Sequence, residues 1–321
     1  MRMCNVKTKT AVLIPCYNEE VTIKKVITDF QKTMPWAEIY VYDNNSTDRT
    51  AEIALECGAN LRFEYKQGKG NVVRSMFRDI EADCYILVDG DDTYPAEDAL
   101  RLENAVLSGK ADMAIGDRLS STYFEENKRA FHNFGNVLVK KLINFIYKSD
   151  VHDIMTGLRA FSYDFVKSFP VMSKGFEIET EMTVFALDNN FKLYETPIDY
   201  RDRPSGSESK LNTVKDGTRV LKTIVSLFKN TKPFIFFSML SAIFMIIALV
   251  LFIPVFIEYL KTGLVPRIPT LIVSIGMMMF SFLTLNSGIT LSVLKRQERQ
   301  QVERHLTTVK MINNIRGDNN E

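Results

Sequence analysis

The chain has 321 residues, with 40 Lys and Arg against 39 Asp and Glu and a formal net charge of +1. This balance excludes a strongly basic protein that coats nucleic acid and an acidic disordered chain. The charge is unevenly distributed, because the only charged residues within 233–294 are Glu258, Lys261 and Arg267. A polar N-terminal part is therefore followed by an apolar part.

Short apolar runs alternate with amphipathic segments over residues 1–115. The apolar runs predict strands at Ala11–Ile14, Ile39–Tyr42, Leu61–Tyr65, Tyr85–Val88 and Met113–Ile115. The amphipathic segments predict helices at Glu19–Thr33, Asp48–Cys57, Gly70–Ala82 and Ala96–Ser108. This order predicts an α/β fold, a mostly parallel sheet flanked by helices. Ligands of such sheets bind at the carboxyl ends of strands, so the residues after each run are candidates for chemistry.

Polar clusters follow the first two predicted strands, with PCYNEE at 15–20 and DNNSTD at 43–48. In the first cluster, a helix N-cap at Asn18 is a sufficient explanation. The second cluster can hold a ribose or a base, or it can form a turn and a cap. Lys69, between two glycines, follows the third strand at the start of a helix, where backbone amides favour a phosphate. The spacings of a P-loop and of a GxGxxG motif are absent, which disfavours a dinucleotide oxidoreductase.

Two carboxylates, Asp89 and Asp91, follow the fourth predicted strand. Residues two apart in an extended chain point the same way, and like charges this close favour a cation between them. Mg²⁺ or Mn²⁺ suits oxygen ligands and leaves positions for substrate phosphates. The alternative is a solvated acidic turn, but the buried strand just before the motif and the nearby Lys69 favour the metal.

Basic residues gather further along the chain, at Arg118, in the segment DIMTGLR at 153–159 and in the segment RDRPSGSESK at 201–210. Arginine and lysine suit phosphate groups, although a solvated surface explains each of them when taken alone. Residues 130–148 combine an apolar face with lysines and predict either an interfacial helix or an ordinary packed helix.

Two stretches without charge, 233–257 and 268–294, each exceed the roughly 20 residues that a helix needs to cross a bilayer. Residues 1–10 are polar and do not predict a signal peptide. The positive-inside rule then predicts cytoplasmic termini, from the flanking residues Lys222, Lys229, Lys232, Lys295, Arg296 and Arg299. The predicted parts are a catalytic domain at 1–210, a juxtamembrane amphipathic helix at 211–232, spans at 233–257 and 268–294 joined by an external loop at 258–267, and a tail at 295–321.

Together these motifs resemble the family-2 glycosyltransferases with a GT-A (Rossmann-like) fold. More narrowly, they resemble polyprenyl-phosphate glycosyltransferases of the dolichol-phosphate-mannose synthase type and their bacterial undecaprenyl-phosphate relatives. The matching segments are IPCYNEE, DNNSTD in place of the usual DDxSxD, GKG, DGDDTYPAE, the D-x-x-T-G-L-R segment and RPSGSESKL. The resemblance covers about residues 8–230 with the paired apolar stretches, and it is specific for the family but not for the sugar.

The resemblance implies roles for single residues. The nucleotide pocket would comprise Pro15, Tyr17, Glu19, Asp43, Asn44, Asp89 and, near the diphosphate, Lys69. Asp89 and Asp91 would bind Mg²⁺ or Mn²⁺. Thr93 stands where the family often has glutamine, so a water molecule could replace a third protein ligand. The acceptor-phosphate candidates are Arg118, Arg159, Arg203 and Lys210. The predicted catalytic residues are Asp91, Asp153 and Arg159, with Asp153 in a positioning role.

The implied activity is inverting transfer of one sugar from UDP-N-acetylglucosamine or UDP-glucose to undecaprenyl phosphate. The reaction would occur at the cytoplasmic face of the cell membrane and serve cell-wall or surface polysaccharide modification. A phosphate monoester with a second pKa of about 6 is already an anionic nucleophile at neutral pH. Two alternatives remain, a membrane glycosyltransferase with a hydroxyl acceptor (a glycolipid or glycan) and a non-catalytic nucleotide-binding scaffold. A homo-oligomer or a small membrane partner is compatible with the chain, and no nucleic acid is expected.

Overall fold

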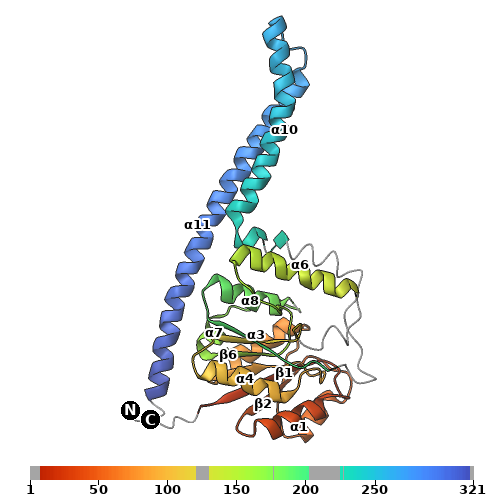
Figure 1. Cartoon of the computed structure of the whole chain (residues 1–321), viewed down its shortest axis with the longest axis vertical. Helices are drawn as coiled ribbons and strands as arrows, with labels where there is room; N and C mark the ends of the chain where they lie inside the picture. The colour runs from red at the N-terminus through yellow and green to blue at the C-terminus, as the bar shows by residue number, and fades with distance from the viewer. Residues whose placement is uncertain (1–7, 121–129, 176, 202–224, 227, 319–321) are drawn as a thin grey trace. The chain divides into compact units, whose positions relative to one another are not determined.

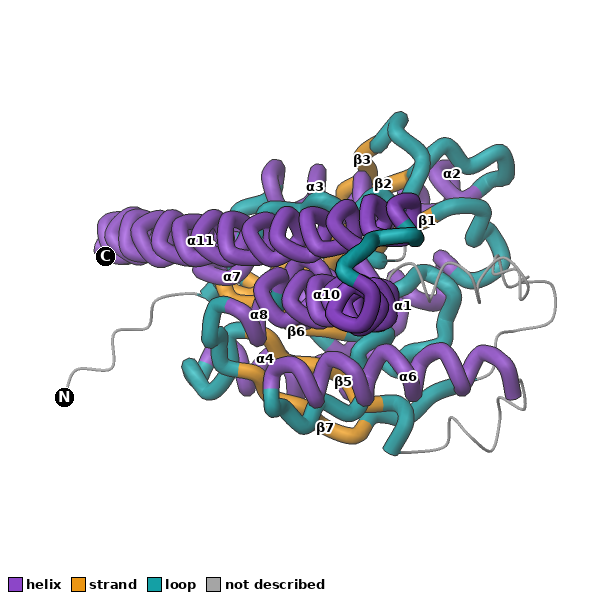
Figure 2. Tube along the Cα trace, turned by 90° about the horizontal axis from the view of Figure 1, so that it is seen from above, coloured by secondary structure: helices purple, strands orange, loops and turns teal. Residues whose placement is uncertain are grey.

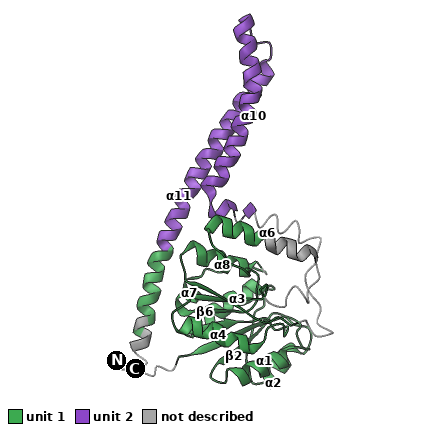
Figure 3. Ribbon diagram, in the orientation of Figure 1, with its two compact units in different colours: residues 1–216, 302–321 green, residues 217–301 purple. Residues whose placement is uncertain are grey.

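The computed structural model describes residues 8–120, 130–175, 177–201, 225–226 and 228–318. The chain divides into two compact units, one of residues 1–216 with 302–321 and one of residues 217–301 (Figure 3). The boundary at 216 lies close to the end of the predicted catalytic domain at 210. The predicted juxtamembrane helix at 211–232 falls mostly outside the described residues.

The first unit is built on a seven-stranded sheet (Figure 1). The strands are β1 (Thr10–Cys16), β2 (Glu38–Asp43), β3 (Asn60–Phe63), β4 (Cys84–Leu87), β5 (Met113–Asp117), β6 (Arg159–Ser162) and β7 (Leu193–Pro197). Their order is β3-β2-β1-β4-β6-β5-β7. Among the strands that the structure describes, only β6 is antiparallel to its neighbours, β4 and β5. The carboxyl ends of β2, β1 and β4 therefore meet at one edge of the sheet.

Helices cover both faces of this sheet. The described helices between β1 and β7 are α1 (Ile23–Thr33), α2 (Thr50–Glu56), α3 (Lys69–Asp79), α4 (Ala96–Leu107), α6 (Ala130–Tyr147), α7 (Tyr163–Ser168) and α8 (Ile178–Asp188), of which α6 packs against α8. Successive strand side chains point to opposite faces, and Val12 and Ile14 join the core formed with α1 and α4. On the other face α3 and α7 pack together, where the rings of Phe77, Phe161 and Phe165 meet.

The five predicted strands and four predicted helices are present, with shifted ends. The first helix begins at Ile23 rather than Glu19, because Asn18 takes a left-handed conformation with φ 53° and a turn follows it. The segment predicted as a helix at 130–148 is α6. The two sides of this helix differ in exposure, because Ile143 is buried whereas Phe145 is 81% exposed.

The second unit consists mainly of α10 (Pro233–Thr262) and the first part of α11 (Ile268–Asp318). Both helices are long and apolar enough to cross a membrane, by length and composition. They lie side by side (Figures 1 and 2), and each of Ser241 and Ser281 donates a hydroxyl hydrogen bond to the other's carbonyl at 2.9 Å. The predicted second span and tail are thus one continuous helix of 51 residues. Its last part belongs to the first unit, where Leu306 and Val309 are buried.

Candidate functional site

Residues predicted from the strand ends gather at one edge of the sheet. Cys16 at the end of β1 lies in register with Asp43 at the end of β2, and the Asn44 amide donates to the Cys16 carbonyl at 2.9 Å. Since β4 pairs with β1 on its other side, the motif after β4 reaches the same edge. Four predicted residues therefore lie on neighbouring strand ends: Pro15, Tyr17, Asp43 and Asp89.

The Asp43 carboxylate has one oxygen in use and one without a partner. This side chain is buried, with the residue 4% exposed. Its Oδ2 atom accepts a hydrogen bond from the Ser46 amide at 3.0 Å, whereas Oδ1 has no hydrogen-bond partner among the described residues. A buried carboxylate oxygen normally finds a donor. The arrangement thus offers an acceptor to an N–H or O–H group of a ligand.

Asn44 and Glu19 take parts that sequence alone did not indicate. The Asn44 amide group donates to the carbonyls of Glu64 and Lys66 and accepts from the Gly68 amide, at 2.6, 3.0 and 2.7 Å. Asn44 therefore holds the loop between β3 and α3, so its side chain is committed to the protein. Near Glu19, the Thr22 hydroxyl donates to the Gly90 carbonyl at 2.7 Å and lies 3.4 Å from the Glu19 carboxylate. This places Glu19 beside the Asp89–Asp91 segment.

Lys69 lies between two carboxylates in the interior. Its Nζ atom is 2.5 Å from Asp89 Oδ1 and 2.7 Å from Glu179 Oε1. Burial acts to lower the pKa of Lys69, but the two carboxylates outweigh it and raise this pKa above its ordinary value. Burial also raises the pKa of Glu179, while Lys69 opposes that rise. One ammonium thus faces two carboxylates, which leaves the trio with a net negative charge when both acids are ionised.

The glycines beside Lys69 make room for another part of the chain. A Cβ atom at Gly68 would lie 2.1 Å from the Lys174 carbonyl oxygen, and one at Gly70 would lie 2.3 Å from that of Ser173. The Gly70 amide donates to the Lys174 carbonyl at 3.1 Å. The expectation that this loop directs its amides at a phosphate is therefore not met by Gly70. A side chain is excluded at both glycines because the backbone of Ser173 and Lys174 packs directly against them.

Asp91 is oriented by its own loop. Its Oδ1 atom accepts hydrogen bonds from the Thr93 hydroxyl at 2.6 Å and from the Thr93 amide at 3.3 Å. Thr93 thus orients Asp91 from the position where a third metal ligand was considered. Among the described residues, no group of three His, Cys, Asp or Glu side chains could hold a metal. Two carboxylates fit Mg²⁺ or Mn²⁺, which commonly complete their coordination with water and substrate phosphates.

On the other side of the motif, Arg118 and Asp153 form an ion pair. Arg118 Nε donates to Asp153 Oδ2 at 2.8 Å, and another guanidinium nitrogen donates to the Met155 carbonyl at 2.7 Å. The Tyr94 hydroxyl lies 3.5 Å from the same guanidinium and accepts from the Gly157 amide at 2.8 Å. Gly157 in turn abuts Asp89, because a Cβ atom there would lie 2.2 Å from Asp89 Oδ2. The Arg118–Asp153 ion pair and the Asp89–Asp91 motif are therefore neighbours.

Arg159 lies inside the protein, contrary to the prediction that it binds the acceptor phosphate. Its side chain is fully buried, at 0% exposure. The guanidinium donates to the Ile154 and Thr156 carbonyls and to the Thr183 hydroxyl, at 2.5, 3.2 and 2.9 Å. It therefore shapes the 153–159 segment from within. Two further predicted phosphate ligands, Arg203 and Lys210, lie outside the described residues.

Two residues of this site escaped the sequence reasoning. Glu179 is separated from Lys69 by 110 positions, so only folding brings them together. The start of α8 carries two acids, Glu179 and Glu181, so the local pattern did not single out Glu179. Tyr94 lies within the recognised DGDDTYP motif, but its contacts with Arg118 and Gly157 depend on the antiparallel return of the chain. A buried tyrosine is expected to find such polar partners.

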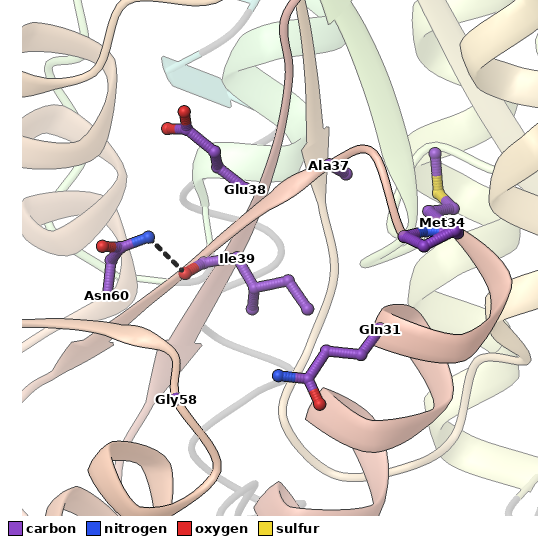
Figure 4. A pocket seen from close by; sticks show the side chains of 8 residues that line it. Gln31, Met34, Ala37, Glu38, Ile39, Gly58 and Asn60 are labelled. Atoms are coloured by element: carbon purple, nitrogen blue, oxygen red, sulfur yellow. Dashed lines mark hydrogen bonds between the residues drawn. The ribbon is translucent and has the colours of Figure 1, made fainter.

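A surface cavity of about 290 Å³ lies elsewhere, between the end of α1 and the starts of β2 and β3 (Figure 4). It is lined by Gln31, Met34, Pro35, Ala37, Glu38, Ile39, Gly58 and Asn60. Because β2 begins at Glu38 and ends at Asp43, this cavity is at the opposite edge of the sheet from the candidate site. None of the predicted site residues lines it.

Residues 11–169 match the family described as Glycosyl transferase family 2. The chain is 30% identical over 294 residues to Glycosyltransferase AglJ from Haloferax volcanii, covering 91% of this chain and 96% of that protein. It is 29% identical over 215 residues to the dolichyl-phosphate hexose transferase of the same organism, covering 67% and 92%.

Among solved structures, the chain is similar to glucosyl-3-phosphoglycerate synthase from Mycobacterium tuberculosis, determined in complex with Mn²⁺, UDP and glucosyl-3-phosphoglycerate. The TM-score is 0.55 at 19% identity, with 70% of this chain and 80% of that chain covered. A likeness at this identity shows the fold, which is GT-A. The near full-length relative and the family match, which spans the predicted site residues up to Arg159, together establish that this chain belongs to glycosyl transferase family 2, whose members use nucleotide sugars.

Proposed function

We propose that this glycosyltransferase transfers one sugar, with inversion, from a UDP-sugar to a polyprenyl phosphate at the cytoplasmic membrane surface. UDP-N-acetylglucosamine and UDP-glucose are the proposed donors, and undecaprenyl phosphate is the proposed acceptor. The observation that carries the proposal is the Arg118–Asp153 pair beside the Asp89–Asp91 motif, in a chain with two apolar helices. A relative that is named a dolichyl-phosphate hexose transferase supports the same acceptor class.

On the donor side, each residue has a distinct task. The Asp43 oxygen that has no partner among the described residues suits the imide N–H of a uracil ring. Tyr17, which is partly exposed, would form a side of the nucleotide pocket. Asp89 and Asp91 would hold Mg²⁺ or Mn²⁺, which would neutralise charge on the departing nucleoside diphosphate. Lys69 and Thr93 hold these two carboxylates in place before substrate binds.

On the acceptor side, the geometry favours a phosphate over a hydroxyl. A hydroxyl acceptor needs a general base, and the nearby candidate is Asp153. Its carboxylate already accepts from Arg118 and from the Met155 amide, at 2.8 and 3.1 Å. A phosphate oxygen needs no base and would instead be attracted by the Arg118 guanidinium. Attack on the anomeric carbon opposite the leaving diphosphate would convert an α-linked donor into a β-linked product.

The two apolar helices support a location at the membrane, where a polyprenyl phosphate presents its headgroup. Basic residues flank the apolar stretches on the sides that we assign to the cytoplasm. A nucleotide sugar made in the cytoplasm would then reach the site directly. The proposed product faces the cytoplasm, and a separate protein would have to move it across the membrane.

The test uses membranes that contain the full chain, radiolabelled UDP-sugars, Mn²⁺ and undecaprenyl phosphate. We expect an acid-labile, lipid-extractable sugar to form with UDP-N-acetylglucosamine or UDP-glucose and to be absent with GDP-mannose. Addition of a diacylglycerol acceptor in place of undecaprenyl phosphate tests the hydroxyl alternative. Absence of a labelled lipid phosphate sugar with every donor would overturn the proposal.

A further inference from the structure

The chain that leaves β7 is attached to both sides of the candidate site. The Ile198 amide donates to the Asp117 carbonyl at 3.0 Å, and the Arg201 amide donates to the Thr93 carbonyl at 3.0 Å. Thr93 is the residue that orients Asp91. Thr93 therefore contacts both the backbone of Arg201 and the proposed metal-binding carboxylate of Asp91, although residues 91 and 201 are far apart in sequence.

The side chains of Tyr200 and Arg201 reach different groups. The Tyr200 ring packs edge-on against that of Tyr94, with centroids 5.7 Å apart, and the Arg118 guanidinium lies 5.8 Å from its centroid. The Arg201 guanidinium lies 3.7 Å from Asp92 Oδ1. Tyr200 thus contacts the acceptor side, whereas Arg201 contacts the loop on the donor side.

Asp92 joins these contacts to α1. It is buried and takes a left-handed conformation with φ 56°, which is uncommon for residues other than glycine and asparagine-like side chains. Lys25 Nζ donates to Asp92 Oδ1 at 2.7 Å and to Asp29 at 2.8 Å. Partial burial acts to lower the pKa of Lys25, but these two carboxylates raise it above its ordinary value. The charged Lys25 ammonium therefore holds the Asp92 carboxylate in the place where Arg201 contacts it.

We propose that Asp92 and Arg201 are positioning residues that set the spacing between the donor and acceptor sides of the site. They hold the chain at Arg201 against the loop that carries Asp91. Neither is among the residues that we propose to bind the donor, the metal or the acceptor. The inference rests on the proposed function, because it assigns the acceptor to the Arg118 side. Loss of the Asp92–Arg201 pair should weaken use of the lipid acceptor while leaving donor binding intact.

The experiment measures steady-state kinetics of the full chain in detergent, with undecaprenyl phosphate and with the UDP-sugar that supports turnover. The variants are Asp92→Asn, Arg201→Met and the double variant. Asparagine tolerates the left-handed conformation, so Asp92→Asn should fold. Arg49→Met is the matched control. It removes an exposed ion pair between Arg49, the N-cap residue of α2, and Glu52 within that helix. Unfolding temperatures are measured for all variants.

We expect each single variant to raise the KM for undecaprenyl phosphate about tenfold, as the loss of an orienting contact does at other sites. The KM for the UDP-sugar should change less than about twofold, and Arg201→Lys should recover part of the loss. The double variant should resemble the single ones, because residues that act as one unit are not additive. Arg49→Met should match the wild type.

The outcomes separate this inference from the proposed function. A wild-type protein that makes no lipid-linked sugar overturns the proposed function and, with it, this inference. An active wild type whose variants show unchanged lipid KM, or equal changes in both KM values, overturns only the positioning role. Fully additive losses in the double variant would also contradict it, because Asp92 and Arg201 would then act separately.

Discussion

The donor and acceptor sides of the candidate site balance their charges differently. On the donor side, Asp89 and the buried Glu179 share one ammonium, that of Lys69. On the acceptor side, Arg118 forms an ion pair with Asp153. The donor side therefore carries excess negative charge that suits a divalent cation when both of its acids are ionised, whereas the Arg118 guanidinium offers a cation to a phosphate. Each side is prepared for the ion that we propose it binds.

The largest expected effect comes from removing a donor-side carboxylate. Asp91→Ala should reduce turnover at least about 100-fold, the size found when a group that stabilises developing charge is lost. The measurement is sugar transfer to undecaprenyl phosphate at saturating Mn²⁺. An unchanged unfolding temperature would show that the protein still folds. Retained turnover would mean that the metal site is misplaced.

The ion pairs of Lys69 with Asp89 and Glu179 on the donor side can be broken by replacing the lysine. Lys69→Met leaves two carboxylates without their shared partner and should destabilise the protein by about 3–5 kcal/mol, as removal of one member of a buried ion pair does. Adding Glu179→Gln should restore part of that stability, because one uncompensated charge disappears. Chemical denaturation in detergent measures both. Equal stability of the single and double variants would contradict a charge-based role for Glu179.

The boundary between the two sides can be tested with one methyl group. Gly157→Ala would place a Cβ atom 2.2 Å from Asp89 Oδ2, so the carboxylate must move although Lys69 holds its other oxygen. Turnover should fall about tenfold through misplacement of the metal ligand. Stability should change little by comparison. Gly109→Ala is not a suitable control because of its positive φ, whereas Gly276→Ala introduces a Cβ atom with nothing within 4 Å.

The smallest effect is expected on the acceptor side. Asp153→Asn keeps the size of the side chain and should lower turnover by less than about tenfold, whereas loss of a general base costs about 100-fold or more. The comparison is made with undecaprenyl phosphate as the acceptor at neutral pH. Near-complete loss of activity would favour a hydroxyl acceptor that Asp153 deprotonates. The donor and acceptor sides would then differ by catalytic base rather than by charge balance.

Many elements of the fold and several site residues could be predicted from local sequence pattern. The alternation of apolar and amphipathic segments predicted β1 to β5, because short apolar runs and helical periodicity are properties of neighbouring residues. Asp43, Lys69, Asp89 and Asp91 could be selected because parallel strands bring their carboxyl ends to one edge. The two apolar helices followed from composition alone, since a bilayer imposes a length and excludes charge.

Other features were decided by tertiary structure. Arg159 looked like a phosphate ligand, but its antiparallel strand β6 lies inside the sheet, where nearby carbonyls and Thr183 take up its donors. Asn44 looked like a nucleotide contact, but it holds the loop before α3. Glu179 and Lys69 meet only because α8 returns to the site. Sequence by itself determined which residues reach the edge of the sheet, and the packing of distant segments decided which of them remain available to a ligand.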